Sequence, residues 1–459
     1  MDFMRKYLLM FILLGSVFKG LAQDNKAILK LSVSDAQTFA LQNNRTIQSA
    51  KLDVKSMDKL IWSNIASGLP QVNFQANYQH QFVIPQLSFG PQLDLNSLND
   101  GFVTKQNLLD NYKNSAPIPL GVRNNTIFDF TLSQLIFSGE YLVGLQAAKV
   151  EKQITEKSLI KTEDITKENV ATTYYLVLIL DENARVLRES LKSTDQTYND
   201  LVAMNKEGFN EETDVDQMKI GRSNIQSLIT SIESQKEISM KLLKFQLGVG
   251  FDQVVDLTDS LPQIINQGNI QYLSSQEFNV NNSIDYKMVT DAEKISTLML
   301  KRTQSKFLPT ISAFYRHEEQ SNLPAFNFAV KDVAGATLTL PILTSGMRNA
   351  NVGQAKFDLY KSRLNKDIVE QSLIMEYESA KSSYQTAFSN FTTNKESMLL
   401  SRKVYDKSVI KYKEGVSTSF ELTQNQAQFL TAESNYYNSI LAMLNAKAKL
   451  DRILSISNK

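Results

Sequence analysis

The sequence consists of two similar halves, and this internal repeat constrains the fold more than any other feature. Three dipeptides recur in the same order: Leu-Pro at 69–70 and 308–309, Ser-Gly at 138–139 and 345–346, and Glu-Gly at 207–208 and 414–415. The Ser-Gly and Glu-Gly pairs both repeat at an offset of 207 residues. Because 69 residues separate these two pairs in each half, we expect a rigid, regular element between them.

The first half is longer than the second between its Leu-Pro and Ser-Gly pairs. The spacing from Pro70 to Gly139 is 69 residues and that from Pro309 to Gly346 is 37, a difference of 32 residues. The extra residues lie within about 85–120, where four prolines and several Gly and Asn residues are typical of a loop. Because loops tolerate insertions and packed elements do not, this stretch is predicted to be an exposed insertion loop.

Each half continues from its Ser-Gly pair into long helical sequence. Residues 140–205 and 348–413 contain no proline and one glycine each, and both are rich in Lys, Glu, Gln, Leu and Ala. A helix of about 65 residues is roughly 100 Å long and needs partners of similar length. Helical sequence resumes after each Glu-Gly pair, which predicts helical hairpins at about 139–248 and 346–455 that turn at Gly208 and Gly415.

Four segments have the period-two pattern of β-strands, at about 70–84, 125–137, 309–320 and 325–341. In the clearest of them, apolar side chains such as Val72 and Phe74 alternate with uncharged polar ones. A membrane tolerates no open strand edge, and four strands are too few to close a barrel, so closure requires several chains. Two copies would give about 8 strands around a filled interior, whereas three give about 12 strands and a lumen, so we infer a homotrimer.

The expected fold class is therefore an α+β membrane protein. Its strands would form a trimeric 12-stranded transmembrane β-barrel, with four strands per chain, that continues into a long α-helical barrel. The polar faces of the strands would line water, and the aromatic faces would contact lipid.

The N-terminus and the composition indicate export rather than a nucleic-acid partner. Arg5 and Lys6 precede an apolar run at 7–18 and small residues at Gly20 and Ala22, so residues 1–22 are predicted to be a signal peptide. No later stretch approaches 18 uninterrupted apolar residues, so any crossing of a membrane would use strands. The net charge of +1 gives no sign of nucleic-acid binding, and the absence of cysteine excludes thiol catalysis and zinc–thiolate sites.

The segment at 31–54 resembles the opening signature of the outer-membrane efflux (TolC-like) family. The match consists of five residues, Leu31, Ala36, Ala40, Leu41 and Asn44, and the Leu-Pro, Ser-Gly and Glu-Gly pairs also follow the order of that family. Arg45 stands where many members have proline, a departure that affects only the local turn. Two repeats of this family are expected, at 23–262 and 263–459.

The resemblance implies a location, a set of partners and a function. It implies a homotrimer in the outer membrane of a Gram-negative bacterium, in contact with outer-membrane lipid, with the helical part in the periplasm. The implied partners are a periplasmic adaptor (membrane fusion) protein and an inner-membrane pump of RND, ABC or MFS type. The implied function is the passive exit duct of a tripartite efflux or type I secretion system.

The resemblance also implies functional residues near the hairpin turns. The segment 412–426 is similar to the gating segment of the family, in which Tyr412, Glu421 and Gln424 occupy the corresponding positions. The offset of 207 relates Glu421 to Asp214 and Gln424 to Gln217. Threefold symmetry would gather such carboxylates into rings that concentrate cations. The alternative is that these acids only stabilise the start of a helix.

The turn pairs Glu207-Gly208 and Glu414-Gly415 are interpreted as turn architecture and adaptor contacts. The two histidines, His80 and His317, lack a nearby set of carboxylates in the sequence. No metal site and no cofactor are therefore expected. The tyrosine pairs at 174–175 and 436–437 are assigned to packing.

Two other functional classes compete with the exit duct. A secreted structural coiled-coil protein of the envelope would explain the long helices, but neither the alternating strands nor the repeated dipeptides. An envelope enzyme is not expected, because no Ser-His-Asp pattern, phosphate-binding glycine loop or paired-carboxylate spacing stands out.

Overall fold

The computed structural model describes residues 28–87, 118–266, 277–324, 327 and 329–455. The predicted signal peptide at 1–22 and most of the predicted insertion loop lie outside these residues. The chain divides into two compact units. Unit 1 consists of residues 1–52, 157–287 and 368–459, and unit 2 of residues 53–156 and 288–367.

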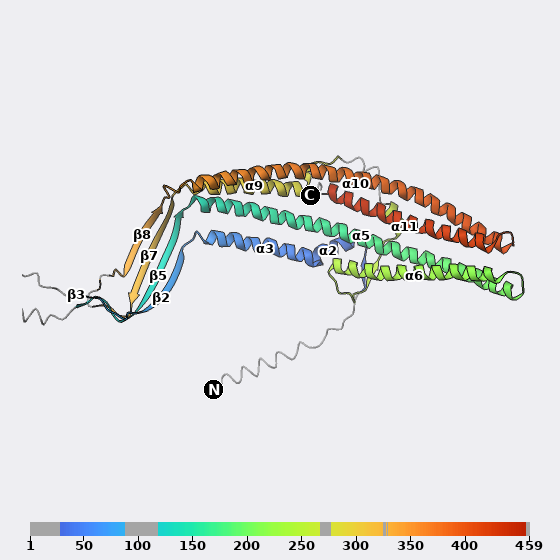
Figure 1. Ribbon diagram of the computed structural model, residues 1–459, viewed down its shortest axis with the longest axis horizontal. Helices are drawn as coiled ribbons and strands as arrows, with labels where there is room; N and C mark the ends of the chain where they lie inside the picture. Colours follow the sequence, from blue (N-terminus) through green and yellow to red (C-terminus); the bar gives the residue numbers. More distant parts are fainter. Residues whose placement is uncertain (1–27, 88–117, 267–276, 325–326, 328, 456–459) are drawn as a thin grey trace, which may run out of the picture. The chain divides into compact units, whose positions relative to one another are not determined.

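Unit 2 contains a four-stranded antiparallel sheet in the order β2-β5-β7-β8 (Figure 1). Its strands are β2 (Gln71–His80), β5 (Asn124–Phe137), β7 (Thr310–Gln320) and β8 (Asp332–Thr339). The sheet therefore takes two strands from each half of the sequence, and β2 and β8 are its edges. A short pair, β3 (Gln86–Leu87) with β4 (Ile118–Pro119), continues beyond β2 and β5.

The first and last strands are shorter than the alternation predicts. β2 ends at His80, and β8 begins at Asp332, although the pattern extends over 70–84 and 325–341. The chain bends at residues 82 and 83, just after β2. Pro341 follows β8 and cannot donate a ladder hydrogen bond, which limits the end of that strand but not its start. Residues 325, 326 and 328 of the fourth predicted segment lie outside the described residues.

The two faces of the sheet differ in chemistry and in exposure. On β5 the apolar side chains of Phe128, Phe130 and Leu132 are 37%, 46% and 40% exposed. The intervening polar side chains, including Asp129 and Thr131, are only partly exposed. In a water-soluble sheet the apolar face would be the covered one, so β5 has the opposite arrangement, while the side chains of β2 are exposed on both faces.

Helices precede or follow each strand of the sheet in unit 2. They comprise parts of α3 (Arg45–Ala66), α5 (Gly139–Lys206), α9 (Ile284–Ser305) and α10 (Met347–Lys413). The hydroxyl of Tyr141 donates to the carbonyl of Ile65 over 2.9 Å. Glu293 accepts from Arg363 at 3.2 Å and from Lys366 at 3.1 Å, so ion pairs link α9 to α10.

Unit 1 is mainly a helical bundle. It contains the remainder of α5 and α10, together with α6 (Glu212–Leu247) and α11 (Ser419–Ser455). Its main apolar core lies where α2 (Val33–Asn43) and the parallel pair β1 (Leu29–Leu31) and β6 (Val255–Leu257) pack on these helices. Tyr174 is fully buried there and donates to the carbonyl of Leu31 over 3.0 Å. The short helices α7 (Leu261–Asn266) and η2 (Val280–Asn282) complete the unit.

The α+β content expected from the sequence is confirmed. No helix in the described part of the chain is both long enough and apolar enough to cross a membrane. Tyr174 and Tyr437 are 0% and 6% exposed, so the packing role predicted for the tyrosine pairs is confirmed at these two residues.

Candidate functional site

The two helical hairpins of unit 1 turn in the same way. Gly208 and Gly415 adopt φ angles of 82° and 70°, the left-handed region that side chains with a Cβ disfavour. The amide of the residue after each glycine donates to the carbonyl five residues earlier, at 3.0 Å from Phe209 to Met204 and at 2.9 Å from Val416 to Lys411. This pattern is the Schellman motif, which closes a helix C-terminus. The turn conformation predicted for both glycines is confirmed.

Glu207 and Glu414, which precede these glycines, have exposed side chains. They sit at the ends of α5 and α10, and Figure 1 shows both turns at the same end of unit 1. Their exposure leaves both carboxylates accessible to a partner protein.

A hydrogen-bonded cluster connects the two hairpins just beyond their turns. The hydroxyl of Ser419, in the first turn of α11, donates to the carboxylate of Asp214 in the first turn of α6. The same hydroxyl lies 3.1 Å from the amide oxygen of Gln217. Because a hydroxyl has one proton, it serves one acceptor at a time, and the charged Asp214 is the stronger acceptor. We call Asp214, Gln217 and Ser419 the turn cluster.

Tyr412 lies beside the turn cluster at the end of α10. Its ring packs on an apolar cluster that includes Leu201, Met218 and Leu422. Burial raises the pKa of the Tyr412 hydroxyl, and the negative charge of Asp214 raises this pKa further. The phenol therefore stays neutral to a higher pH than a free tyrosine does.

Glu421 and Gln424 do not join the turn cluster. Both side chains are exposed on α11, and Glu421 accepts a hydrogen bond from Ser417 over 2.9 Å. The structure thus brings together Asp214, Gln217 and Tyr412 of the five residues proposed near the turns. The other two face outward in the single chain.

Sequence reasoning missed Ser419 and a second polar group deeper in the bundle. The amide of Gln426, which is 3% exposed, donates to Thr194 at 2.6 Å and lies 3.3 Å from the hydroxyl of Tyr405. Gln426 occupies a helical stripe with the buried residues Leu422 and Phe429. A polar residue at such a position was the available signal, because buried amides need partners.

Glu433 has a buried carboxyl group one helical turn beyond Phe429, on the same face of α11. Its side chain is 4% exposed, and its Oε2 atom has no hydrogen-bond partner among the described residues. Burial raises the pKa of Glu433 from 4.5 to about 7, the charge of Arg402 lowers it, and that of Glu189 raises it.

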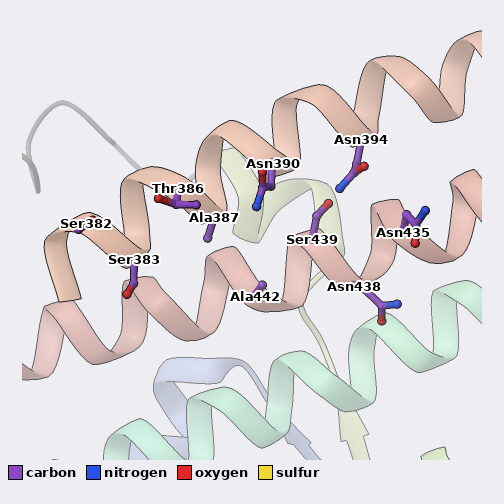
Figure 2. Close-up of a pocket in the computed structure, with 10 residues that line it drawn as sticks. All are labelled: Ser382, Ser383, Thr386, Ala387, Asn390, Asn394, Asn435, Asn438, Ser439 and Ala442. Carbon is purple, nitrogen blue, oxygen red and sulfur yellow. The ribbon is translucent and has the colours of Figure 1, made fainter. Parts of the chain in front are cut away.

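The helices α10 and α11 also enclose an uncharged polar groove of about 540 Å³ (Figure 2). Figure 2 shows that its lining comes from both helices: Ser382, Ser383, Thr386, Ala387, Asn390, Asn394, Asn435, Asn438, Ser439 and Ala442. These side chains offer hydrogen bonds but no nucleophile activated by a base and no ionisable group. Within the described ranges, no group of three or more His, Cys, Asp or Glu side chains could hold a metal ion.

Residues 300–455, which contain β7, β8, α10 and α11, match the family model described as outer membrane efflux protein. The second of the two repeats therefore contains an outer membrane efflux protein domain. The resemblance drawn from the sequence is confirmed. Among curated protein sequences, none matches the chain.

Solved channel structures share the fold of this chain. The Campylobacter jejuni CmeC outer membrane channel has a TM-score of 0.70 at 16% identity, covering 93% of this chain and 86% of CmeC. CusC, from a study of transmembrane channel formation, has a TM-score of 0.71 at 15% identity, with coverage of 96% and 95%. The Vibrio cholerae outer membrane protein VceC has a TM-score of 0.68 at 13% identity, with coverage of 93% and 96%.

Proposed function

We propose that this efflux protein is the exit duct through which an inner-membrane pump and a periplasmic adaptor discharge their substrates. It lies in the outer membrane of a Gram-negative bacterium, and its helical part lies in the periplasm. Three copies would close one channel, with four strands from each. The duct would be passive and would serve a tripartite efflux or type I secretion system driven by a pump of RND, ABC or MFS type.

The arrangement of the strand faces is the observation that carries this proposal. Phe128, Phe130 and Leu132 are exposed on one face of the sheet, and the polar side chains between them are partly covered. This arrangement suits a sheet whose outer surface contacts lipid and whose inner surface contacts water.

The unpaired sheet edges support assembly into a trimer. β2 and β8 each hydrogen-bond to one neighbour in the sheet. In a lipid environment unpaired backbone groups are costly, so β8 of one copy would pair with β2 of the next. Three such joints would close a ring of 12 strands, which is wide enough for a lumen.

The hairpin turns would form the periplasmic entrance of the duct. In this proposal Asp214, Gln217, Tyr412, Glu421 and Gln424 line the aperture, and the hydrogen bond from Ser419 to Asp214 holds the two hairpins of one chain together. Opening the aperture would require the hairpins to separate, which breaks this bond.

The exposed turns would contact the adaptor. The side chains of Glu207 and Glu414 are accessible, and Gly208 and Gly415 keep the turns narrow. Adaptor contact at these four residues is a proposal that rests on their position and on the family.

Single-channel recording in planar bilayers tests the duct and its aperture together. We expect wild-type protein to show a small, discrete conductance. Ser419→Ala and Asp214→Ala should raise the conductance by about twofold or more, because each removes the bond that holds the hairpins together. Glu421→Ala should also raise it, if three copies of this carboxylate meet at the aperture. Asp216→Ala is the matched control, because Asp216 is an exposed acid on the same turn of α6.

Three results would contradict the duct or its closure at the turn cluster. Folded, membrane-inserted trimers that conduct in no variant would remove the channel function. A fully water-soluble secreted rod would favour a structural coiled-coil protein of the envelope instead. Conductance that rises equally with Asp216→Ala would show that the turn cluster has no special role in closure.

A further inference from the structure

The charged side chains on the polar face of the four-stranded sheet lie in a single cluster. Side chains that share this face are given by the strand register, in which Gln75 lies opposite Asp129, Asp129 opposite Glu318, and Thr131 opposite Arg316. Among the residues of β2, β5, β7 and β8, only Asp129, Arg316 and Glu318 are charged on this face. The remaining polar side chains are uncharged, as in Gln71, Asn73, Gln75, Asn77, Gln79, Asn125, Thr131, Ser133, Thr337 and Thr339.

These three charged side chains form one ionic cluster. The guanidinium of Arg316 donates to Glu318 over 2.8 Å and lies 3.6 Å from Asp129. One positive charge is thus shared between two carboxylates. The cluster retains one net negative charge per chain. Arg123 continues the register of this face but lies outside the four strands, where its carbonyl accepts from the amide of Gln81.

Uncharged neighbours hold both carboxylates in place. Thr131 donates to Asp129 over 2.6 Å, and Gln320 donates to Glu318 over 2.8 Å. The side chains of Asp129 and Glu318 are only 21% and 14% exposed. Charges that are partly shielded from water act more strongly on a passing ion than freely hydrated ones.

We infer that Asp129, Arg316 and Glu318 form a charge filter inside the strand-lined part of the duct that favours cationic over anionic solutes. This inference rests on the proposed function, because only ring closure of three copies brings three such clusters around one lumen. A closed ring would then carry three net negative charges. Its action on solutes is separate from the aperture at the hairpin turns, because the cluster belongs to unit 2 and the turn cluster to unit 1.

The reversal potential under a KCl gradient measures this preference. Wild-type channels should favour K⁺ over Cl⁻. The double change Asp129→Asn with Glu318→Gln leaves Arg316 alone on the face, and we expect the permeability ratio to fall by about threefold or more. Arg316→Gln should raise the ratio, because two carboxylates then act unopposed. The matched control is Glu319→Gln, since Glu319 neighbours Glu318 on the opposite face and pairs with Lys331 at 2.8 Å.

A chemical measurement does not depend on the electrical resistance of the narrow aperture at the hairpin turns. The chain has no cysteine, so Ser133→Cys places a single thiol on the polar face, two positions beyond Thr131. Cationic and anionic methanethiosulfonates are added to the inserted protein, and the ratio of their reaction rates with the thiol is measured. This ratio is compared between Ser133→Cys alone and Ser133→Cys combined with Asp129→Asn and Glu318→Gln. We expect the ratio of cationic to anionic rates to fall by about threefold.

The outcomes separate the inference from the proposed function. The charge filter would be overturned if the variants insert and conduct normally but leave two quantities unchanged. These are the permeability ratio of K⁺ to Cl⁻ and the ratio of cationic to anionic reaction rates. An equal shift with Glu319→Gln would overturn it as well. Inserted protein that never conducts would instead remove the duct. If the double variant fails to insert, the opposite shift expected for Arg316→Gln still decides the question.

Discussion

At the scale of single residues, Glu433 is the most unusual side chain of the bundle. A carboxyl in the folded interior normally has a hydrogen-bond donor, and the Oε2 atom of Glu433 has none among the described residues. The charged groups that act on it are Arg402 from α10 and Glu189 from α5, and Tyr437 lies one helical turn away on α11. Since its pKa rises from 4.5 to about 7, the carboxyl is protonated in the folded chain over a range in which it is ionised in the unfolded chain.

Glu433 should therefore make stability depend on pH in a defined direction. The folded chain binds the additional proton between about pH 4.5 and 7, so stability falls as the pH rises through this window and stays lower above it. Glu433→Gln should remove the penalty and stabilise the protein at pH 8 by about 3 kcal/mol, with little effect near pH 4.5. Melting temperatures at both pH values measure the difference. Glu378→Gln, on the exposed face of α10, should show no such change.

At the scale of elements, the hairpins depend on the backbone of their turns. Gly208 and Gly415 have positive φ angles, and a Cβ atom at either position would meet no neighbouring side chain or backbone within 4 Å. A side chain there would therefore raise the free energy through backbone strain and not through a steric clash. The long helices on either side contain glycines of a different kind. Gly353, within α10, also has free space but has no positive φ angle.

Alanine substitutions at Gly415 and Gly353 should therefore change the stability of the protein in opposite directions. Gly415→Ala should destabilise the hairpin by about 1 kcal/mol, because it forces alanine into the left-handed region. Gly353→Ala should stabilise the protein by roughly 0.5–1 kcal/mol, because alanine is the better helix former. Denaturation midpoints provide the comparison, and hydrogen exchange at the turn amides should quicken only in Gly415→Ala. Equal effects at both positions would contradict the role of the turn motif.

At the scale of the whole molecule, the proposed barrel requires the sheet to insert with its apolar face outward. Leu132 and Ser133 are consecutive on β5 but lie on opposite faces, and Leu132 is 40% exposed. The apolar face has no cover in the single chain, so its solvent must be lipid or another protein surface.

A charge should therefore be tolerated on one face and not on the other. Leu132→Lys should weaken insertion by about 2–4 kcal/mol, the cost of a lysine that contacts the hydrocarbon core, whereas Ser133→Lys should insert as well as the wild type. The fraction of heat-resistant trimer in outer-membrane preparations or lipid vesicles reports the outcome. A reversed order would mean that the polar face contacts lipid.

Much of the local structure follows from short-range pattern. Alternation at Val72 and Phe74 leads to β2, and the absence of proline over 140–205 leads to α5. The glycines at 208 and 415 turn as predicted, because a left-handed residue after a helix almost requires glycine. The extent of β8 was less accurate, because it begins at Asp332 and alternation from 325 does not show where the ladder with β7 starts.

The sequence by itself determined which segments are helices, strands and turns, and which family they resemble, because period, proline and glycine act over a few residues. Only the tertiary structure decided that Ser419 bonds to Asp214, 205 residues away, and that Arg316 bridges Asp129 and Glu318. These contacts depend on the register between helices and between strands. A shift of one residue would turn each side chain to another face, and long-range packing sets that register.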